Sequence, residues 1–318
     1  MMVPGTSMRM DGKIIAWRGF LNELTRGMVW LLMTPMLAFA LPATEDRIGF
    51  SIIKTASSAG TQEALVFESG SWFTRRHLWQ NAVLITHPKG DILIDTGLGR
   101  EVDQQFAENS FFDRQLFGYE DLDPAADQMQ RNNYDINQVT RIIPTHLHWD
   151  HASGIKDFPF AEVWVQRAEH DEAIHGKPPV HLLSQIDDPA IKWHFVELDT
   201  VPYEGFSKSV DVYGDGSIVL VDLSGHSAGQ LGIFLRVSSG KRYFFSGDTT
   251  WTFKGVKDNA QRSGIIRWLV DVNWDTEKNT MQIEKLHQLN NNEASVQIIP
   301  AHDELVAKTL PRFPEFGY

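Results

Sequence analysis

The chain has 318 residues, of which 42% are hydrophobic and 22% are charged, and it contains no cysteine. This composition is typical of a folded protein with a sizeable core, and it excludes a disordered chain. The lack of cysteine excludes disulfides, thiolate nucleophiles, cysteine zinc sites and iron–sulfur clusters, so any metal must be held by His, Asp or Glu. The formal net charge of −12 argues against a nucleic-acid partner, which would need a basic surface.

The N-terminal segment, residues 1–40, is predicted to be a signal peptide. It carries four basic side chains against two acidic ones, and residues 28–43 contain no charge. Ala38 and Ala40 supply the small residues typical of a cleavage site. The apolar run is shorter than the ~20 residues of a membrane-spanning helix, and Pro35 interrupts it. We therefore expect a periplasmic or secreted protein without stable membrane insertion after cleavage; a retained anchor and a cytoplasmic apolar segment are the alternatives.

The rest of the chain, residues 41–318, is predicted to form one domain of mixed α/β structure, because no linker rich in Pro, Gly or Ser interrupts it. Short runs rich in β-branched and aromatic residues predict eight strands: 82–87, 91–97, 139–145, 162–166, 217–223, 231–237, 242–248 and 296–302. Several runs are almost wholly apolar, which is typical of strands covered on both faces.

Three helices are predicted, at 168–175, 258–271 and 276–291, the last capped by Asp275 or Thr276. Residues 101–134 are polar and aromatic, with weak periodicity. They predict a helical or loop insertion that covers a site.

A dense group of metal-ligand side chains follows the strand predicted at 139–145. The sequence from His146 to His151 reads H-L-H-W-D-H. In an extended segment, residues two apart point to the same face, so His146 and His148 lie together, and Asp150 and His151 follow where the chain leaves the strand. Four such side chains within six residues suit one divalent ion or two adjacent ions.

Three further side chains of the same kind each end a predicted apolar strand: His226, Asp248 and His302. Taken alone, each is more typical of a core or turn residue. Together with the first motif they predict a metal centre, because ligand sites in sheet proteins collect where strands end.

The order of these motifs resembles the metallo-β-lactamase superfamily: HxHxDH, then GHS, then GD, then a final His. The segment DILIDTG, which contains Asp95, fits the same pattern. The resemblance extends from about residue 64 to about residue 305. It implies a four-layer αββα sandwich, two sheets face to face with helices outside and metals at one edge.

The resemblance also implies a role for each ligand. His146, His148 and His226 would hold one metal, and Asp150, His151 and His302 would hold the second. Asp248 would bridge the two metals. Asp95 would orient the ligands, and a plain turn aspartate before Gly97 is the alternative for that position.

Seven nitrogen and oxygen ligands are too many for one tetrahedral zinc and suit two divalent ions. Zinc is the expected metal, with manganese, iron or cobalt as alternatives. Two such ions can share a hydroxide that attacks a carbonyl or phosphoryl centre. Asp150 can orient the hydroxide or relay a proton to the leaving group. Asp150 and Asp248 are therefore the predicted catalytic residues, and the predicted partner is a small-molecule substrate.

Within the superfamily, the chain resembles the acyl-homoserine-lactone lactonases. The GHSAGQ loop, the 22 positions from His226 to Asp248 and the C-terminal segment IIPAHD carry this resemblance. The expected reaction is hydrolysis of a lactone or another carboxylic ester; a phosphoester is the alternative substrate, and a non-catalytic metal-binding protein is disfavoured. The chain departs at one position. Those lactonases have a catalytic tyrosine where this chain has Trp251, whose indole donates a hydrogen bond but is no acid like a phenol.

Two groups of side chains are interpreted with less specific roles. Aromatic residues are candidates to line an apolar substrate pocket, with the core as the alternative: Phe111, Phe112, Phe117, Tyr119 and Trp251. Three histidines on or after the helix predicted at 168–175 are interpreted as surface residues: His170, His175 and His181.

Overall fold

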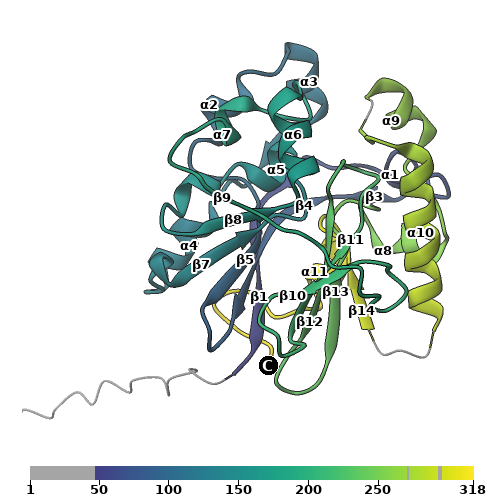
Figure 1. Ribbon diagram of the computed structural model, residues 1–318. Coiled ribbons are helices and arrows are strands. Elements are labelled where there is room, and N and C mark those ends of the chain that lie inside the picture. Colours follow the sequence, from purple (N-terminus) through teal and green to yellow (C-terminus); the bar gives the residue numbers. More distant parts are fainter. Residues whose placement is uncertain (1–46, 271, 293–295) are drawn as a thin grey trace, which may run out of the picture. The chain divides into compact units, whose positions relative to one another are not determined.

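The structure is a computed structural model that describes residues 47–270, 272–292 and 296–318 (Figure 1). The segment predicted to be a signal peptide lies outside these residues. The described residues belong to one compact unit, Thr44–Tyr318. None of the helices they form is long and apolar enough to cross a membrane.

Two β-sheets form the centre of this unit. The first has seven strands in the order β6 (Tyr119–Glu120), β1 (Gly49–Ser58), β4 (Trp79–Thr86), β5 (Asp91–Thr96), β7 (Val139–Ile143), β8 (Glu162–Val165) and β9 (Lys192–Phe195). The second has five strands in the order β10 (Ser209–Asp211), β11 (Ile218–Asp222), β12 (Leu231–Arg236), β13 (Arg242–Phe245) and β14 (Val296–Ile299). A short third sheet pairs β2 (Thr61–Gln62) with β3 (Arg75–Arg76).

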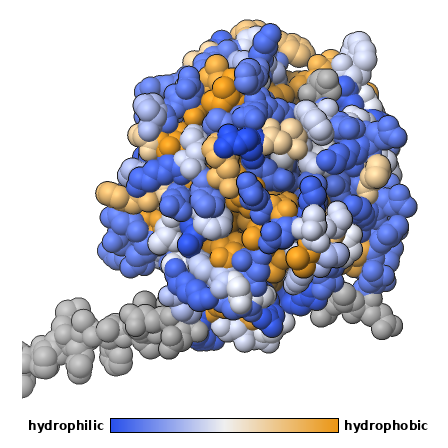
Figure 2. Space-filling view, in the orientation of Figure 1, coloured by the Kyte–Doolittle hydropathy of each residue, from blue (hydrophilic) through white to orange (hydrophobic). Residues whose placement is uncertain are grey.

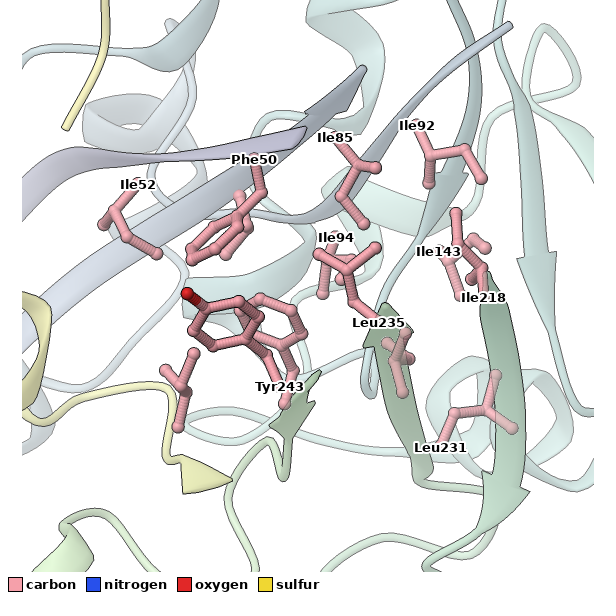
Figure 3. Packing of buried hydrophobic residues seen from close by; sticks show 14 of the residues in the cluster. Phe50, Ile52, Ile85, Ile92, Ile94, Ile143, Ile218, Leu231, Leu235 and Tyr243 are labelled. Atoms are coloured by element: carbon pink, nitrogen blue, oxygen red, sulfur yellow. The ribbon is translucent and has the colours of Figure 1, made fainter. Parts of the chain in front are cut away.

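Side chains two apart on the strands build the core between the two sheets. In β5, Ile92 and Ile94 face the second sheet, whereas Leu93 packs on the outer side. Figure 3 shows this inner layer, in which the ring centre of Phe50 lies 4.6 Å from that of Tyr243. The strands are apolar on both faces because each face is covered.

Helices cover the outer face of each sheet (Figure 1). The first sheet packs against side chains of α4 (Ala125–Arg131), α5 (Trp149–Ala152), α6 (Arg167–His175) and α7 (Leu183–Ile186). The second packs against α8 (Phe253–Lys257) and α10 (Thr276–Asn291). The predicted αββα sandwich is confirmed. Hydrophilic residues make up most of the face in Figure 2, with hydrophobic residues in the gaps among them.

The eight predicted strands are all present, and three of them end two or three residues before the predicted end. The strands predicted at 139–145, 242–248 and 296–302 stop at residues 143, 245 and 299. The ligand-bearing residues that follow leave the sheet at one edge. Their backbone is then free to turn toward a common point, as expected for a site at the ends of strands.

Two of the three predicted helices are confirmed as α6 and α10, and Asp275 caps α10 by accepting the Lys278 N–H at 2.9 Å. The prediction of one continuous helix at 258–271 is wrong. The structure has α8 before it and α9 (Gly264–Leu269) inside it. The chain turns between them, where Asn259 has a left-handed φ of 49° and Arg262 is buried.

The predicted insertion, residues 101–134, contains α2 (Val102–Phe106), α3 (Phe111–Leu116), β6 and α4. The remaining described helices are α1 (Glu63–Val66), α11 (Glu304–Ala307) and two 3-10 turns, Ile136–Gln138 and Ile155–Asp157.

Asp157 holds the start of the insertion, because its Oδ2 accepts the Arg100 N–H at 3.1 Å. Burial raises the pKa of Asp157 from 3.8 to about 6, so folding disfavours its charged form. The free-energy cost that the charged Asp157 adds to folding is present above pH 6 and is lost as the pH falls toward the unfolded pKa near 4. Asp157→Asn keeps the acceptor. We expect it to be about 1–2 kcal/mol more stable than wild type at pH 7 and equally stable at pH 4.

Urea unfolding of both proteins at the two pH values measures this difference. Because the comparison is between variants, other titrating groups cancel. A stability difference that does not change with pH would contradict the assignment to Asp157.

Candidate metal centre

The structure brings all seven predicted ligands to one edge of the sandwich. They fall into three overlapping groups whose ligand atoms lie within 4.8 Å of one another: His146, His148 and His226; His146, His151 and Asp248; Asp150, His151 and His302. Six of the seven are buried, and Asp150 is half-buried. Asp248 lies between the two histidine sets, since His226 Nε2 is 3.7 Å from its Oδ2 and His302 Nε2 is 3.1 Å from its Oδ1.

The outer nitrogens of two histidines fix their tautomers. His226 Nδ1 lies 3.0 Å from Asn273 Oδ1, which also accepts a hydrogen bond from Arg262 at 2.9 Å. His302 Nδ1 lies 2.8 Å from the Trp79 carbonyl oxygen. Both partners can only accept, so each Nδ1 carries the proton and each Nε2 presents a lone pair to the centre.

These Nε2 atoms lie close to other ring nitrogens of the centre. His226 Nε2 lies 3.2 Å from His146 Nε2, and His302 Nε2 lies 3.3 Å from His151 Nε2. The buried Asp248 Oδ1 lies 3.1 Å from His302 Nε2 and 3.4 Å from His151 Nε2. Unprotonated ring nitrogens and carboxylate oxygens that converge in this way repel each other unless protons or metal ions lie among them, so this set of residues fits bound divalent ions.

Burial and the neighbouring imidazoles hold the pKa of His146 and of His148 well below the usual value, which keeps both in the neutral form that binds metal. His151 differs: burial acts to lower its pKa, but the carboxylates of Asp95, Asp150 and Asp248 outweigh burial and raise it. Protons therefore compete with metal at His151, and binding of a metal there must release them.

Asp95 contacts the predicted ligand His151. Its Oδ2 lies 3.0 Å from His151 Nδ1, and its Oδ1 accepts the Thr145 N–H at 2.6 Å. Asp95 adopts a left-handed φ of 51°, which is costly for a residue other than glycine and is found where the surroundings impose it. The geometry supports the role of orienting His151 rather than that of a plain turn residue.

Trp251 also contacts a ligand. Its indole Nε1 donates to Asp248 Oδ2 at 2.8 Å. The buried Arg262 lies over the indole ring at 5.0 Å and donates to the Asp248 carbonyl oxygen. Burial lowers the pKa of Arg262 to about 10. Sequence reasoning missed Arg262 and Asn273, because neither belongs to a motif.

Several less specific predictions are corrected by the structure. His181 is buried beside His148 rather than on the surface, with ring centres 4.9 Å apart. His175 is exposed as predicted, and His170 is half-buried against Trp193. Phe111 and Phe112 are exposed, at 73% and 59%, and neither lines the pocket. Tyr119 packs on Trp149 and donates to Asp103, and only Phe117 and Trp251 of that aromatic group line the pocket.

A cavity of about 300 Å³ opens onto the predicted ligands. Its apolar lining residues come from segments far apart in the sequence: Leu65, Leu78, Leu116, Phe117, Trp149, Pro179, Val180, Trp251, Ile266 and Val272. Its titratable lining residues all belong to the centre: His148, Asp150, His226, Asp248 and His302. No Lys or Arg among the described residues lines it.

Comparisons with known proteins agree with this geometry. The profile of the Metallo-beta-lactamase superfamily matches residues 78–296. The N-acyl homoserine lactonase AttM of Rhizobium johnstonii is 26% identical over 238 residues, covering 73% of this chain and 85% of that protein. The N-acyl homoserine lactonase AiiA of Bacillus thuringiensis subsp. kurstaki is 23% identical over 236 residues, covering 73% and 84%.

Solved structures show the same fold. A mutant of B. thuringiensis AiiA with N-decanoyl-L-homoserine bound at its active site has a TM-score of 0.66 and 21% identity, covering 86% of this chain and 99% of that chain. AidC, a dizinc quorum-quenching lactonase in complex with a product, has a TM-score of 0.54 and 16% identity, covering 86% and 90%.

Proposed function

Because this chain belongs to the metallo-β-lactamase superfamily and is a metal-dependent hydrolase, we propose that it is an exported dinuclear enzyme that hydrolyses a lactone or another carboxylic ester. The observation that carries this proposal is the cavity, which joins the metal-ligand side chains to a lining of mostly apolar and uncharged side chains. Such a site suits a neutral substrate with an apolar acyl group next to the bond that is cleaved.

The same cavity favours a carboxylic ester over a charged phosphoester. Enzymes that bind phosphate groups surround them with Arg, Lys or backbone N–H groups. Among the described lining residues no such cation is present, so an anionic substituent would have no counter-charge apart from the metals. The relatives named N-acyl homoserine lactonases support the same choice.

We assign the residues of the centre to metal binding and proton transfer. His146, His148 and His226 would hold one ion, Asp150, His151 and His302 the other, and Asp248 would contact both. Zinc is the expected metal, and bound ions of this kind polarise a carbonyl oxygen and lower the pKa of water to about 7, which supplies hydroxide as the nucleophile. Asp150 is the least buried ligand and lines the cavity. It is therefore the group placed to hold a proton and pass it to the leaving alkoxide.

Export rests on the pattern of charges and apolar residues in the first 40 residues. Expression of the full chain in a Gram-negative host, followed by fractionation and mass measurement, tests it. Export with cleavage predicts a periplasmic or secreted product that begins near Leu41. A full-length product in the cytoplasm would overturn this part of the proposal.

The activity is tested with the zinc-loaded protein and a medium-chain acyl-homoserine lactone, with acid release followed by a pH indicator. His148→Ala is the control, because it removes a ligand at the cavity wall. We expect turnover by the wild type that is lost in the control. Turnover by the wild type would also show that the reaction needs no tyrosine at the position of Trp251. Two bound metals with no turnover of the lactone, but with turnover of a neutral phosphotriester, would overturn the lactonase proposal.

A further inference from the structure

We infer that Glu169 of α6 is a positioning residue for the three histidines of the first metal site, an inference that rests on the proposed metal-dependent function. Glu169 is 1% exposed and lies outside the group of predicted ligands. Its Oε1 accepts the Leu147 N–H at 2.6 Å. Its Oε2 accepts the Ser227 hydroxyl at 2.6 Å and the Gly229 N–H at 3.0 Å. One carboxylate therefore joins two loops.

Both loops carry ligands of the same proposed metal. Leu147 lies between His146 and His148, and Ser227 follows His226 directly. These loops lie beyond the ends of β7 and β11, so sheet hydrogen bonds no longer fix their separation. One backbone hydrogen bond, from the Leu231 N–H to the Thr145 carbonyl oxygen at 2.8 Å, joins the two segments, and the clamp by Glu169 joins them next to the histidines themselves.

The Leu147 peptide is held from both sides. Glu169 accepts its N–H, and His181 Nδ1 lies 3.1 Å from its carbonyl oxygen. Because a carbonyl only accepts, His181 donates from Nδ1. The backbone between the two histidines of the HxH motif is thus fixed by side chains that no motif identified.

The second loop lies against α6 itself. Glu172, one helical turn after Glu169, accepts the Ala228 N–H at 2.6 Å. A Cβ on Gly229 would lie 2.6 Å from the Glu169 backbone nitrogen. The loop can approach the helix this closely only because position 229 has no side chain.

The clamp depends on the negative charge of the Glu169 carboxylate. Burying a carboxylate is costly unless donors satisfy both of its oxygens, and here three short hydrogen bonds do so. A glutamine at this position would turn an NH₂ group toward at least one of these N–H or O–H donors. The isosteric change therefore breaks one arm of the clamp while it keeps the volume and most of the packing.

The test is the metal affinity of Glu169→Gln, measured by zinc competition against a chromophoric chelator in the full-length protein, together with the visible spectrum of the cobalt-loaded form. We expect one of two zinc ions to bind about 10–100-fold more weakly, the usual effect of losing a group that orients metal ligands, and the cobalt bands of one site to shift. The matched control is Asp171→Asn on the same helix, because the Asp171 side chain is exposed and pairs with His170 rather than with a ligand loop. It should bind both ions within about threefold of wild type.

Wild-type zinc affinity and cobalt bands in Glu169→Gln would overturn the inference, whatever its unfolding midpoint. If that variant does not fold, Ser227→Ala removes one donor and must still weaken one zinc ion; wild-type affinity there would overturn the inference instead. Neither readout needs a substrate. A wild-type protein that binds two ions and hydrolyses no lactone would therefore refute the proposed activity and leave the role of Glu169 to be decided by these variants.

Discussion

Asp248→Asn is expected to lower hydrolysis by about 1,000-fold or more, the scale on which loss of one central group in an active site is felt. In the part of the chain that the structure describes, Asp248 is the carboxylate that lies near both histidine sets, through His226 on one side and His302 on the other. Burial acts to raise its pKa, but His302 and His151 outweigh burial and hold the pKa well below the usual range. The neighbouring histidines thus favour the carboxylate form of Asp248, and asparagine removes that charge while it keeps the shape.

The metal content separates this cause from a loss of folding. We expect the purified variant to retain fewer than two ions, with the second ion lost first, because Asp95 and Asp150 still raise the pKa of His151 and protons there compete with the metal. Far-ultraviolet circular dichroism should match wild type. Trp251→Phe is the comparison variant, because it removes the donor to Asp248 Oδ2 and leaves the carboxylate. A fully active Asp248→Asn enzyme would contradict a bridging role.

The predicted ligands could be found in the sequence because each lies within a few residues of the end of an apolar strand. The groups that hold them could not be found, because their partners are far away along the chain. Glu169 lies 22 positions from Leu147 and 58 from Ser227. Asp303, the residue after the ligand His302, accepts a hydrogen bond from Arg76, which lies 227 positions away. No spacing rule connects such pairs; only the packing of α6 and of the C-terminal segment against the sheets brings them together.

The fold, like the site, could be predicted from the sequence only in part. Strands such as β5 and β11 could be predicted, because apolar residues fill both of their faces. The long strand β1 was missed, since it buries Ser51 and Thr55 completely and so breaks the hydrophobic pattern. The helix predicted at 258–271 failed for a related reason. Arg262 in its middle turns inward to Asp248 and Asn273, and that inward turn needs a break in the helix.

Arg76→Met is expected to destabilise the protein by about 3–5 kcal/mol, because it leaves buried carboxylates without their cation. Arg76 is 2% exposed, and its guanidinium donates to both oxygens of Glu304, at 2.7 and 3.0 Å. It also lies 3.0 Å from Asp303 and 3.5 Å from Glu63. Burial acts to lower its pKa, but Glu304 and Asp303 outweigh burial and raise it, so the cation persists.

The same change should reach the metal centre, because Asp303 follows His302 and its Oδ2 accepts the Phe253 N–H at 2.7 Å. We therefore expect weaker zinc binding as well as a lower urea midpoint. Arg131→Met is the matched control: its pair with Asp123 is on the surface, where ion pairs contribute little. Its midpoint should equal that of wild type. Equal midpoints for Arg76→Met and Arg131→Met would mean that the buried cluster holds neither the fold nor the segment that carries His302.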